Sequence, residues 1–145
     1  MPICIRRACS QDAEGVLPLV VDFATSFHTD ERIFHESFFS LLESRSALVL
    51  VAEEEERLIG YCLGYWHDTF YANGRVAWLE EIMVTASYRR RGIGEAMMEN
   101  FEDWAKKEGA VLSALATRRA SSFYTAIGYE ESASYFRKLL CGSDQ

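Results

Sequence analysis

The sequence predicts a single domain of the α/β (α+β) class with the element order β-α-α-β-β-β-α-β-α-β. Short apolar runs typical of strands recur along the chain, and segments with apolar residues at helical spacing separate several of them. A segment rich in arginine and glycine stands between one such strand and the helix after it. The length of 145 residues suits one domain, 1–145, and no repeat or linker interrupts it.

The first three elements are a strand and two helices. Ile3 to Arg7 alternates apolar and polar side chains, which predicts a strand. Ser10 and Asp12 offer capping oxygens to the first helix, in which Pro18 is expected to cause a kink or a new start. Thr29 is expected to cap the second helix. The apolar sides of the two helices are Val16, Leu17, Val20, Ala24 and Phe27, and then Phe34, Phe38, Leu41 and Leu42.

Three strands are expected in the middle of the chain. The first two, Ala47 to Ala52 and Leu58 to Trp66, flank the charged run Glu53 to Glu56, which reads as a solvated hairpin turn. His67 to Gly74 is polar and aromatic and is expected to be a loop. Val76 to Thr85 is the third of these strands.

The C-terminal part predicts two helices and two strands. A helix with one apolar face follows the glycine-rich segment and is expected to stop near Gly109. Val111 to Ala116 is expected to be a strand, Ala120 to Ile127 a short helix, and Tyr129 to Leu139 a final strand. The face of the longer helix is Ile93, Met97, Phe101 and Trp104.

Composition argues against several classes of function. A formal net charge of -7 disfavours nucleic acid as a partner and suits a cationic one, although acidity also serves solubility. The four cysteines have no paired spacing, and the chain shows no targeting segment and no apolar run that could cross a membrane. A cytoplasmic protein is therefore expected. The three histidines lack metal-ligand spacing, so no metal is expected.

Arg89, Gly92 and Gly94 form an Arg-x-x-Gly-x-Gly turn between a strand and a helix. A helix N-terminus presents unpaired backbone N–H groups and a partial positive charge, and glycine lets a phosphate approach them closely. The pattern matches neither a P-loop nor a dinucleotide-binding fingerprint. It indicates a diphosphate held by amides, or else two glycines that simply shape a tight turn.

Trp78 to Glu95, which reads WLEEIMVTASYRRRGIGE, resembles the acetyl-CoA signature of the GNAT superfamily of N-acetyltransferases, especially that of diamine and polyamine acetyltransferases. The resemblance implies a mixed central sheet of about six to seven strands with about four helices around it. It also implies acetyl-CoA as cosubstrate, with its pyrophosphate on the turn and its pantetheine arm against strand backbone. The residues implied to bind it are Ile82, Met83, Val84, Arg89, Arg90, Arg91, Gly92, Ile93, Gly94, Glu95, Thr117 and Ala120.

The same resemblance implies the catalytic groups. An ammonium has no lone pair, so a base must take its proton, and the family favours Glu80, with Glu81 as a second acidic group or substrate ligand. Neighbours on a regular strand point to opposite faces, so both can serve the site only at a bulge, which the family has here. Thr117 to Tyr129 resembles the block that holds the family's general acid, here Tyr124, although Thr117 replaces an asparagine. An N–H at Met83 or a neighbour is expected to face the oxyanion.

The acceptor is expected to be a small cationic molecule with a primary amine, which attacks acetyl-CoA directly in a ternary complex. Acidic and aromatic residues of the N-terminal helices and the 67–74 loop would bind it. The residues expected to contact it are Asp30, Asp68, Tyr71 and Glu81. A protein or peptide acceptor and a non-catalytic acyl-CoA-binding module remain alternatives, and a homodimer is open.

Overall fold

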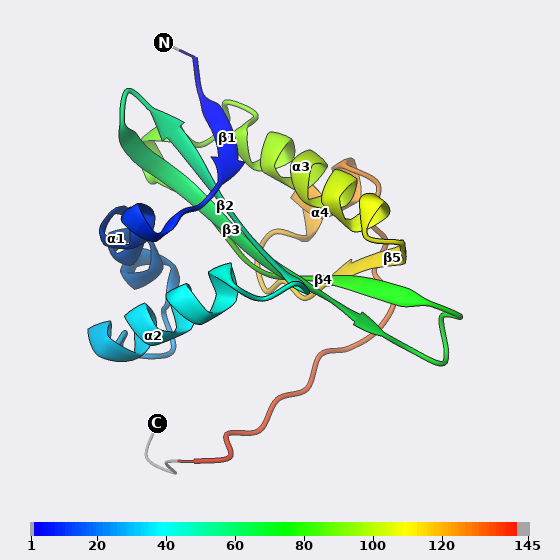
Figure 1. The fold of residues 1–145 in the computed structure, drawn as a ribbon. Coiled ribbons are helices and arrows are strands. Elements are labelled where there is room, and N and C mark those ends of the chain that lie inside the picture. Colours follow the sequence, from blue (N-terminus) through cyan, green and yellow to red (C-terminus); the bar gives the residue numbers. More distant parts are fainter. Residues whose placement is uncertain (1, 142–145) are drawn as a thin grey trace. The chain divides into compact units, whose positions relative to one another are not determined.

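The structure is a computed structural model that describes residues 2–141, in two compact units, 1–115 and 116–145. The first unit holds one mixed sheet and three helices, and the second holds one short helix (Figure 1). The elements of the first are β1 (Cys4–Arg7), α1 (Ala13–Phe23), α2 (Glu31–Leu42), β2 (Ala47–Glu54), β3 (Arg57–Asp68), β4 (Arg75–Val84), α3 (Ile93–Lys107) and β5 (Ala110–Leu115). The single domain over 1–145 stays a prediction.

The five strands follow one another in the sheet in their order along the chain. The first four pair antiparallel, and β4 pairs with β5 in parallel across the α3 crossover. Glu55 and Glu56 turn the chain between β2 and β3 with φ of 51° and 67°, as the short hairpin turn requires. The predicted turn is therefore confirmed for these two residues, whereas Glu53 and Glu54 belong to β2. The mixed sheet is confirmed too, but with five strands instead of six to seven.

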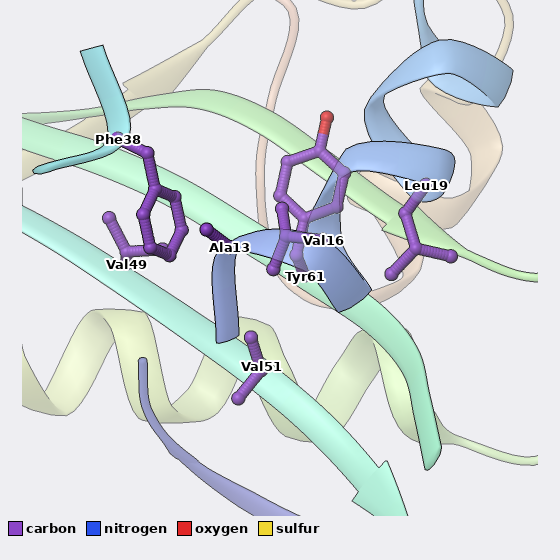
Figure 2. Close-up of a cluster of buried hydrophobic side chains, with 7 residues drawn as sticks. All are labelled: Ala13, Val16, Leu19, Phe38, Val49, Val51 and Tyr61. Carbon is purple, nitrogen blue, oxygen red and sulfur yellow. The ribbon is translucent and has the colours of Figure 1, made fainter. Parts of the chain in front are cut away.

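Helices cover both faces of the sheet (Figure 1). α1 and α2 cover one face with a core cluster to which Ala13, Val16, Leu19, Phe38, Val49, Val51 and Tyr61 contribute (Figure 2). α3 covers the other face through Phe101 and Met97, both fully buried. The predicted apolar face of α3 is therefore confirmed.

Two local expectations for the first helices were wrong in detail. α1 continues through Pro18, so the new start is not observed, while the alternative, a kink, stays a prediction. The buried face of α1 offsets the one N–H bond that proline removes from a helix. α2 is capped by Asp30, whose carboxylate accepts from the backbone N–H of Ile33 at 2.9 Å, and not by Thr29. The sequence offered two adjacent capping oxygens, and the helix uses the second.

A partly buried group of ion pairs fixes the start of α1 to the sheet. The guanidinium of Arg6, on β1, donates to both carboxylate oxygens of Asp12 at 2.8 and 2.9 Å and to Glu53, on β2, at 3.0 Å. The backbone N–H of Cys9 also donates to Asp12, at 2.7 Å. Hydrogen bonds from Arg6 hold the pKa of Asp12 at about 2, against the opposing effect of burial.

This pair predicts a loss of stability in acid. The unfolded chain protonates Asp12 near its ordinary pKa of 3.8 but the folded chain only near 2, so the free energy of unfolding falls as the pH drops between these values. Replacing Asp12 with asparagine should lower the free energy of unfolding by about 2 kcal/mol at pH 7. It should also reduce the further decrease of that free energy in acid. Urea unfolding from pH 2 to 7 measures both. Asp22→Asn, at an exposed position of α1, should keep the decrease of the free energy of unfolding in acid. The same decrease in Asp12→Asn as in the wild type would contradict the assignment.

The second unit corrects one predicted element. It contains α4 (Ser121–Ala126), which confirms the short helix, but residues 129–141 form neither strand nor helix. The strand predicted for Tyr129 to Leu139 was therefore wrong. Its apolar residues occur in adjacent pairs, such as Tyr135 and Phe136, instead of alternating, so they do not form a single face that could be buried. Tyr135 and Phe136 are both exposed.

None of the described helices is long and apolar enough to span a bilayer.

Candidate active site

β4 separates from β5 halfway along its length. β5 pairs with β4 from Arg75 to Leu79, whereas from Glu80 to Val84 the same edge of β4 has no strand partner among residues 2–141. β3 pairs with β4 as far as Val84, so this stretch remains extended. Its outward backbone groups are therefore available to an extended ligand.

A β-bulge occurs where the two strands separate. Leu63 and Gly64 are consecutive on β3, but their partners on β4 are Glu81 and Leu79. Glu80 is thus the extra residue of the bulge, and the alternation of side chains along β4 changes by one position there. The bulge that the family resemblance implied is present.

The bulge brings two carboxylates to one face. Glu81 pairs with Leu63, which packs against the cluster under α1 and α2. Trp78 pairs with Tyr65, two residues further along β3, and so shares that face. The indole N–H of Trp78 donates to Oε1 of Glu80 at 3.1 Å, which holds Glu80 on this side too. In a regular strand Glu80 and Glu81 would point to opposite faces.

Glu81 is anchored by a buried phenol. The hydroxyl of Tyr61, on β3, donates to Oε1 of Glu81 at 2.7 Å. Burial raises the pKa of Glu81, the bond from Tyr61 acts against this rise, and the charge of Glu80 adds to it. Burial and the neighbouring carboxylate also raise the pKa of Tyr61, so the phenol stays a neutral donor. Sequence analysis missed Tyr61 and Trp78, because their relation to the carboxylates depends on the strand register.

The arginine- and glycine-rich turn lies at the end of β4. Arg89 donates to the carbonyl of Val84 at 2.9 Å and so folds the turn back onto the strand. Arg90 and Gly92 have φ of 66° and 80°, and α3 starts directly after Gly92. The backbone N–H groups of residues 91–95 make no hydrogen bond to any described residue, as expected for a helix N-terminus. The predicted phosphate-binding residues Arg89 to Glu95 thus form one turn with free amides, next to Ile82, Met83 and Val84 on the open edge.

Gly92 provides a test of this turn. A Cβ at Gly92 would meet no atom within 4 Å, so the space beside the amides is open in the protein alone. Gly92→Ala should lower CoA affinity about tenfold, because its methyl group would occupy space that a phosphate needs. Gly109 has φ of 90° and equally open surroundings at the other end of α3, so Gly109→Ala carries a similar backbone strain and is the control. Calorimetric titration with CoA compares them, and equal affinities would contradict the assignment.

The predicted residues of the second unit lie on or beside α4. The backbone N–H of Ala120 donates to Oγ1 of Thr117 at 3.1 Å, so this threonine stabilises the start of α4. Tyr124 is 7% exposed, and its ring contacts those of Phe123 and Tyr129 with centroids 4.9 and 5.9 Å apart. The role of Tyr124 as general acid stays a prediction.

Two predicted acceptor ligands lie at the hairpin tip, far along the sheet from the carboxylate pair, and a third caps α2. Asp68 binds Arg75 at 3.0 Å at the tip of the β3–β4 hairpin, where Tyr71 is 76% exposed. Arg75 is six residues from Glu81 along β4, roughly 20 Å at the usual rise of a strand. Asp30 is engaged as the cap of α2. The long hairpin, which the sequence does not reveal, separates this tip from the bulge.

Cys62 and the group around His35 are two further sets of reactive side chains in the first unit. Cys62 is fully buried, and burial raises the pKa of its thiol to about 12, so it is no nucleophile at neutral pH. His35, Glu14 and Glu31 have ligand atoms within 4.8 Å of one another. His35 contacts the backbone carbonyl of Glu31 and the carboxylate of Glu14, each at 2.9 Å, and these contacts raise its pKa. This is an ion pair between α1 and α2, and the absence of a metal stays a prediction.

Comparison with known proteins identifies the family. The model of the acetyltransferase (GNAT) family matches residues 15–129. The chain is 27% identical over 142 residues to the N-acetyltransferase YhfO of Bacillus subtilis, covering 94% of this chain and 95% of that protein. It is 25% identical to the aminoalkylphosphonate N-acetyltransferase of Salmonella typhimurium, covering 97% and 94%.

A solved structure has a similar fold. It is the aminoglycoside N-acetyltransferase AAC(6')-Iy in complex with CoA, with a TM-score of 0.85 and 18% identity over 97% of this chain and 96% of that one. Together with the family match over most of the chain, this likeness confirms the expected mixed α/β fold of the family, although the number of strands and the element order differ from the prediction. The protein therefore belongs to the acetyltransferase (GNAT) family and is an N-acetyltransferase.

Proposed function

We propose that this N-acetyltransferase moves an acetyl group from acetyl-CoA directly to the primary amine of a small cationic acceptor, with both substrates bound together. The observation that carries the proposal is the bulge in β4. It places the carboxylates of Glu80 and Glu81 on one face, at the point where the edge of β4 opens. Two adjacent carboxylates favour a cation, and one of them can take its proton.

The donor site follows from the turn and the open edge. The pyrophosphate of acetyl-CoA would lie on the free amides of Arg91 to Glu95, beside the positive end of α3. The pantetheine arm would pair with backbone of Ile82 to Val84. Arg89 and Arg90 add charge beside this turn, and a donor-binding role of Thr117 and Ala120, in the second unit, stays a prediction. Acetyl-CoA supplies the acetyl thioester.

The acceptor nitrogen must lose two protons, and the departing sulfur must gain one. The acceptor ammonium loses one proton to a carboxylate of the pair, and the free lone pair forms the C–N bond at the thioester carbonyl. A backbone N–H near Met83 would stabilise the oxyanion. The C–S bond then breaks, Tyr124 gives its proton to the departing thiolate, and the second proton of the nitrogen replaces the one that Tyr124 lost. The products are an acetamide, CoA thiol and one proton released to water.

The acceptor site is restricted to the bulge. The carboxylates of Glu80 and Glu81 and the π face of the Trp78 indole are proposed to bind the ammonium. Relatives named for aminoalkylphosphonate and aminoglycoside acetylation support a small acceptor. A protein or peptide acceptor is the second candidate, because Phe70 and Tyr71 are exposed at the hairpin tip, 101% and 76%. A homodimer stays a prediction, for light scattering to test.

The proposal is tested with three amines of equal length and different charge. Labelled acetyl-CoA is incubated with 1,4-diaminobutane, 1-aminobutane or 4-aminobutanoate, and a lysine-containing peptide is added as a fourth acceptor. Mass analysis follows transfer of the label. We expect kcat/KM to be highest for the diamine and lowest for the amino acid. A preference for the amino acid would contradict a cationic acceptor, and a preference for the peptide would favour the second candidate.

A further inference from the structure

The two carboxylates of the bulge lie in different surroundings. Glu80 is exposed and accepts one hydrogen bond, from the indole of Trp78. Glu81 is half-buried, and its Oε1 accepts the hydroxyl of Tyr61. Among the described residues, Oε2 of Glu81 has no hydrogen-bond partner. Neighbouring carboxylates in unlike surroundings commonly have different roles in acid–base chemistry.

Tyr61 is itself held rigidly. It is 2% exposed, belongs to the core cluster under α1 and α2, and packs edge-on against Phe23 at 6.2 Å and 74°. Its hydroxyl points away from the other side chains drawn in Figure 2. A phenol fixed in this way fixes in turn the carboxylate to which it donates.

We infer that Glu81, and not Glu80, takes the proton of the acceptor amine, and that Tyr61 is the positioning residue that aims it. The inference rests on the proposed function. The hydroxyl of Tyr61 donates to Oε1 of Glu81, so Oε2 can accept a hydrogen bond from the ammonium. The proton moves from the acceptor nitrogen to Oε2, the nitrogen lone pair then attacks the thioester, and Glu81 later returns the proton to water. Glu80 keeps its role in binding the cation.

The pKa of Glu81 supports this division. Burial raises it, which makes the carboxylate a stronger base than one in water and brings it nearer to the working pH. The groups that act on it are Tyr61 on β3 and Glu80 on its own strand. Burial, and then the charges of both carboxylates, raise the pKa of Tyr65, also on β3. The structure shows no hydrogen bond from Tyr65 to Glu81 among the described residues.

Four variants separate the roles through the pH profile of kcat/KM, with 1,4-diaminobutane as acceptor. Glu81→Gln should lower kcat/KM about 100-fold at pH 7. It should also remove the low-pH limb, which is the fall of kcat/KM as the base becomes protonated. Glu80→Gln should raise KM and keep the limb. Tyr61→Phe should move the limb to higher pH, because the lost hydrogen bond had stabilised the ionised carboxylate. Tyr65→Phe, the matched loss of one hydroxyl, should leave the limb in place. A limb lost in Glu80→Gln but kept in Glu81→Gln would overturn the inference.

A measurement without turnover separates this inference from the proposed function. In protein labelled with ¹³C at glutamate carboxyls, Glu81→Gln identifies the Glu81 signal, whose titration is followed by NMR. Tyr61→Phe should shift that titration upward by at least half a pH unit, and Tyr65→Phe should not. An unmoved titration in Tyr61→Phe would overturn the positioning role even if the enzyme is active. If no amine is acetylated but the titration moves, the proposed acceptor fails and the positioning contact stands.

Discussion

Replacing Gly64 with alanine is expected to lower the free energy of unfolding by about 3 kcal/mol. Gly64 stands on β3 at the bulge, and a Cβ there would overlap the ring of Phe101, on α3. Phe101 has no exposed surface and packs against Trp104, so its ring has no space into which to move. The methyl group would therefore push α3 from the sheet or distort the strand beside the carboxylates. Urea unfolding monitored by circular dichroism measures the loss.

Two controls make this prediction specific. Gly74→Ala should change stability by less than about 0.5 kcal/mol, because its Cβ would meet Val111 at an ordinary 3.4 Å. Phe101→Leu should recover part of the stability lost in Gly64→Ala, so the double variant should be less destabilised than the sum of the single ones. Additive effects would show that overlap with Phe101 is not the cause.

Replacing Tyr124 with phenylalanine is expected to lower kcat by 10²- to 10³-fold with little change in affinity for CoA. The ring of Tyr124 is buried against Phe123 and Tyr129, and phenylalanine preserves this packing. The lost hydroxyl is the proposed proton donor to the departing thiolate, which is needed in the transition state and not for binding. Steady-state kinetics with 1,4-diaminobutane and calorimetry with CoA give the two quantities.

Tyr129→Phe is the matched control for that variant. It removes a hydroxyl from the partner ring in the same unit and is expected to change kcat by less than about threefold. A Tyr124→Phe enzyme with the kcat of the wild type would exclude the phenol from the mechanism. Equal losses in both variants would point to a shared structural effect.

Elements with strong local signals could be predicted from the sequence. The helix after the glycine turn has a continuous apolar face from Ile93 to Trp104, and four strand runs have β-rich composition between turn signals. Tyr129 to Leu139 has similar composition but no alternation, and its pairing depends on contacts that composition does not specify. Strand content was therefore overestimated there.

The turn of the candidate site has a local sequence signal, whereas the arrangement of its acidic residues does not, and the binding roles of both stay predictions. A phosphate-binding turn requires free backbone N–H groups and glycine at particular positions, and these features lie close together in the sequence. Arg89 to Gly94 could therefore be recognised from residue spacing and glycine content. The partner of Glu81 depends on the register between β3 and β4, which is set by the length of the hairpin and by the bulge at Glu80. For the same reason Asp68 was grouped with residues that lie far from it along the strand.

A crystal structure with CoA and 1,4-diaminobutane tests the central claim most directly. We expect the pyrophosphate on the amides of Arg91 to Glu95, the pantetheine arm along the open edge of β4, and the diamine nitrogen within hydrogen-bond distance of Oε2 of Glu81. A CoA molecule bound away from this edge, or an amine held only by groups outside the bulge, would contradict the account.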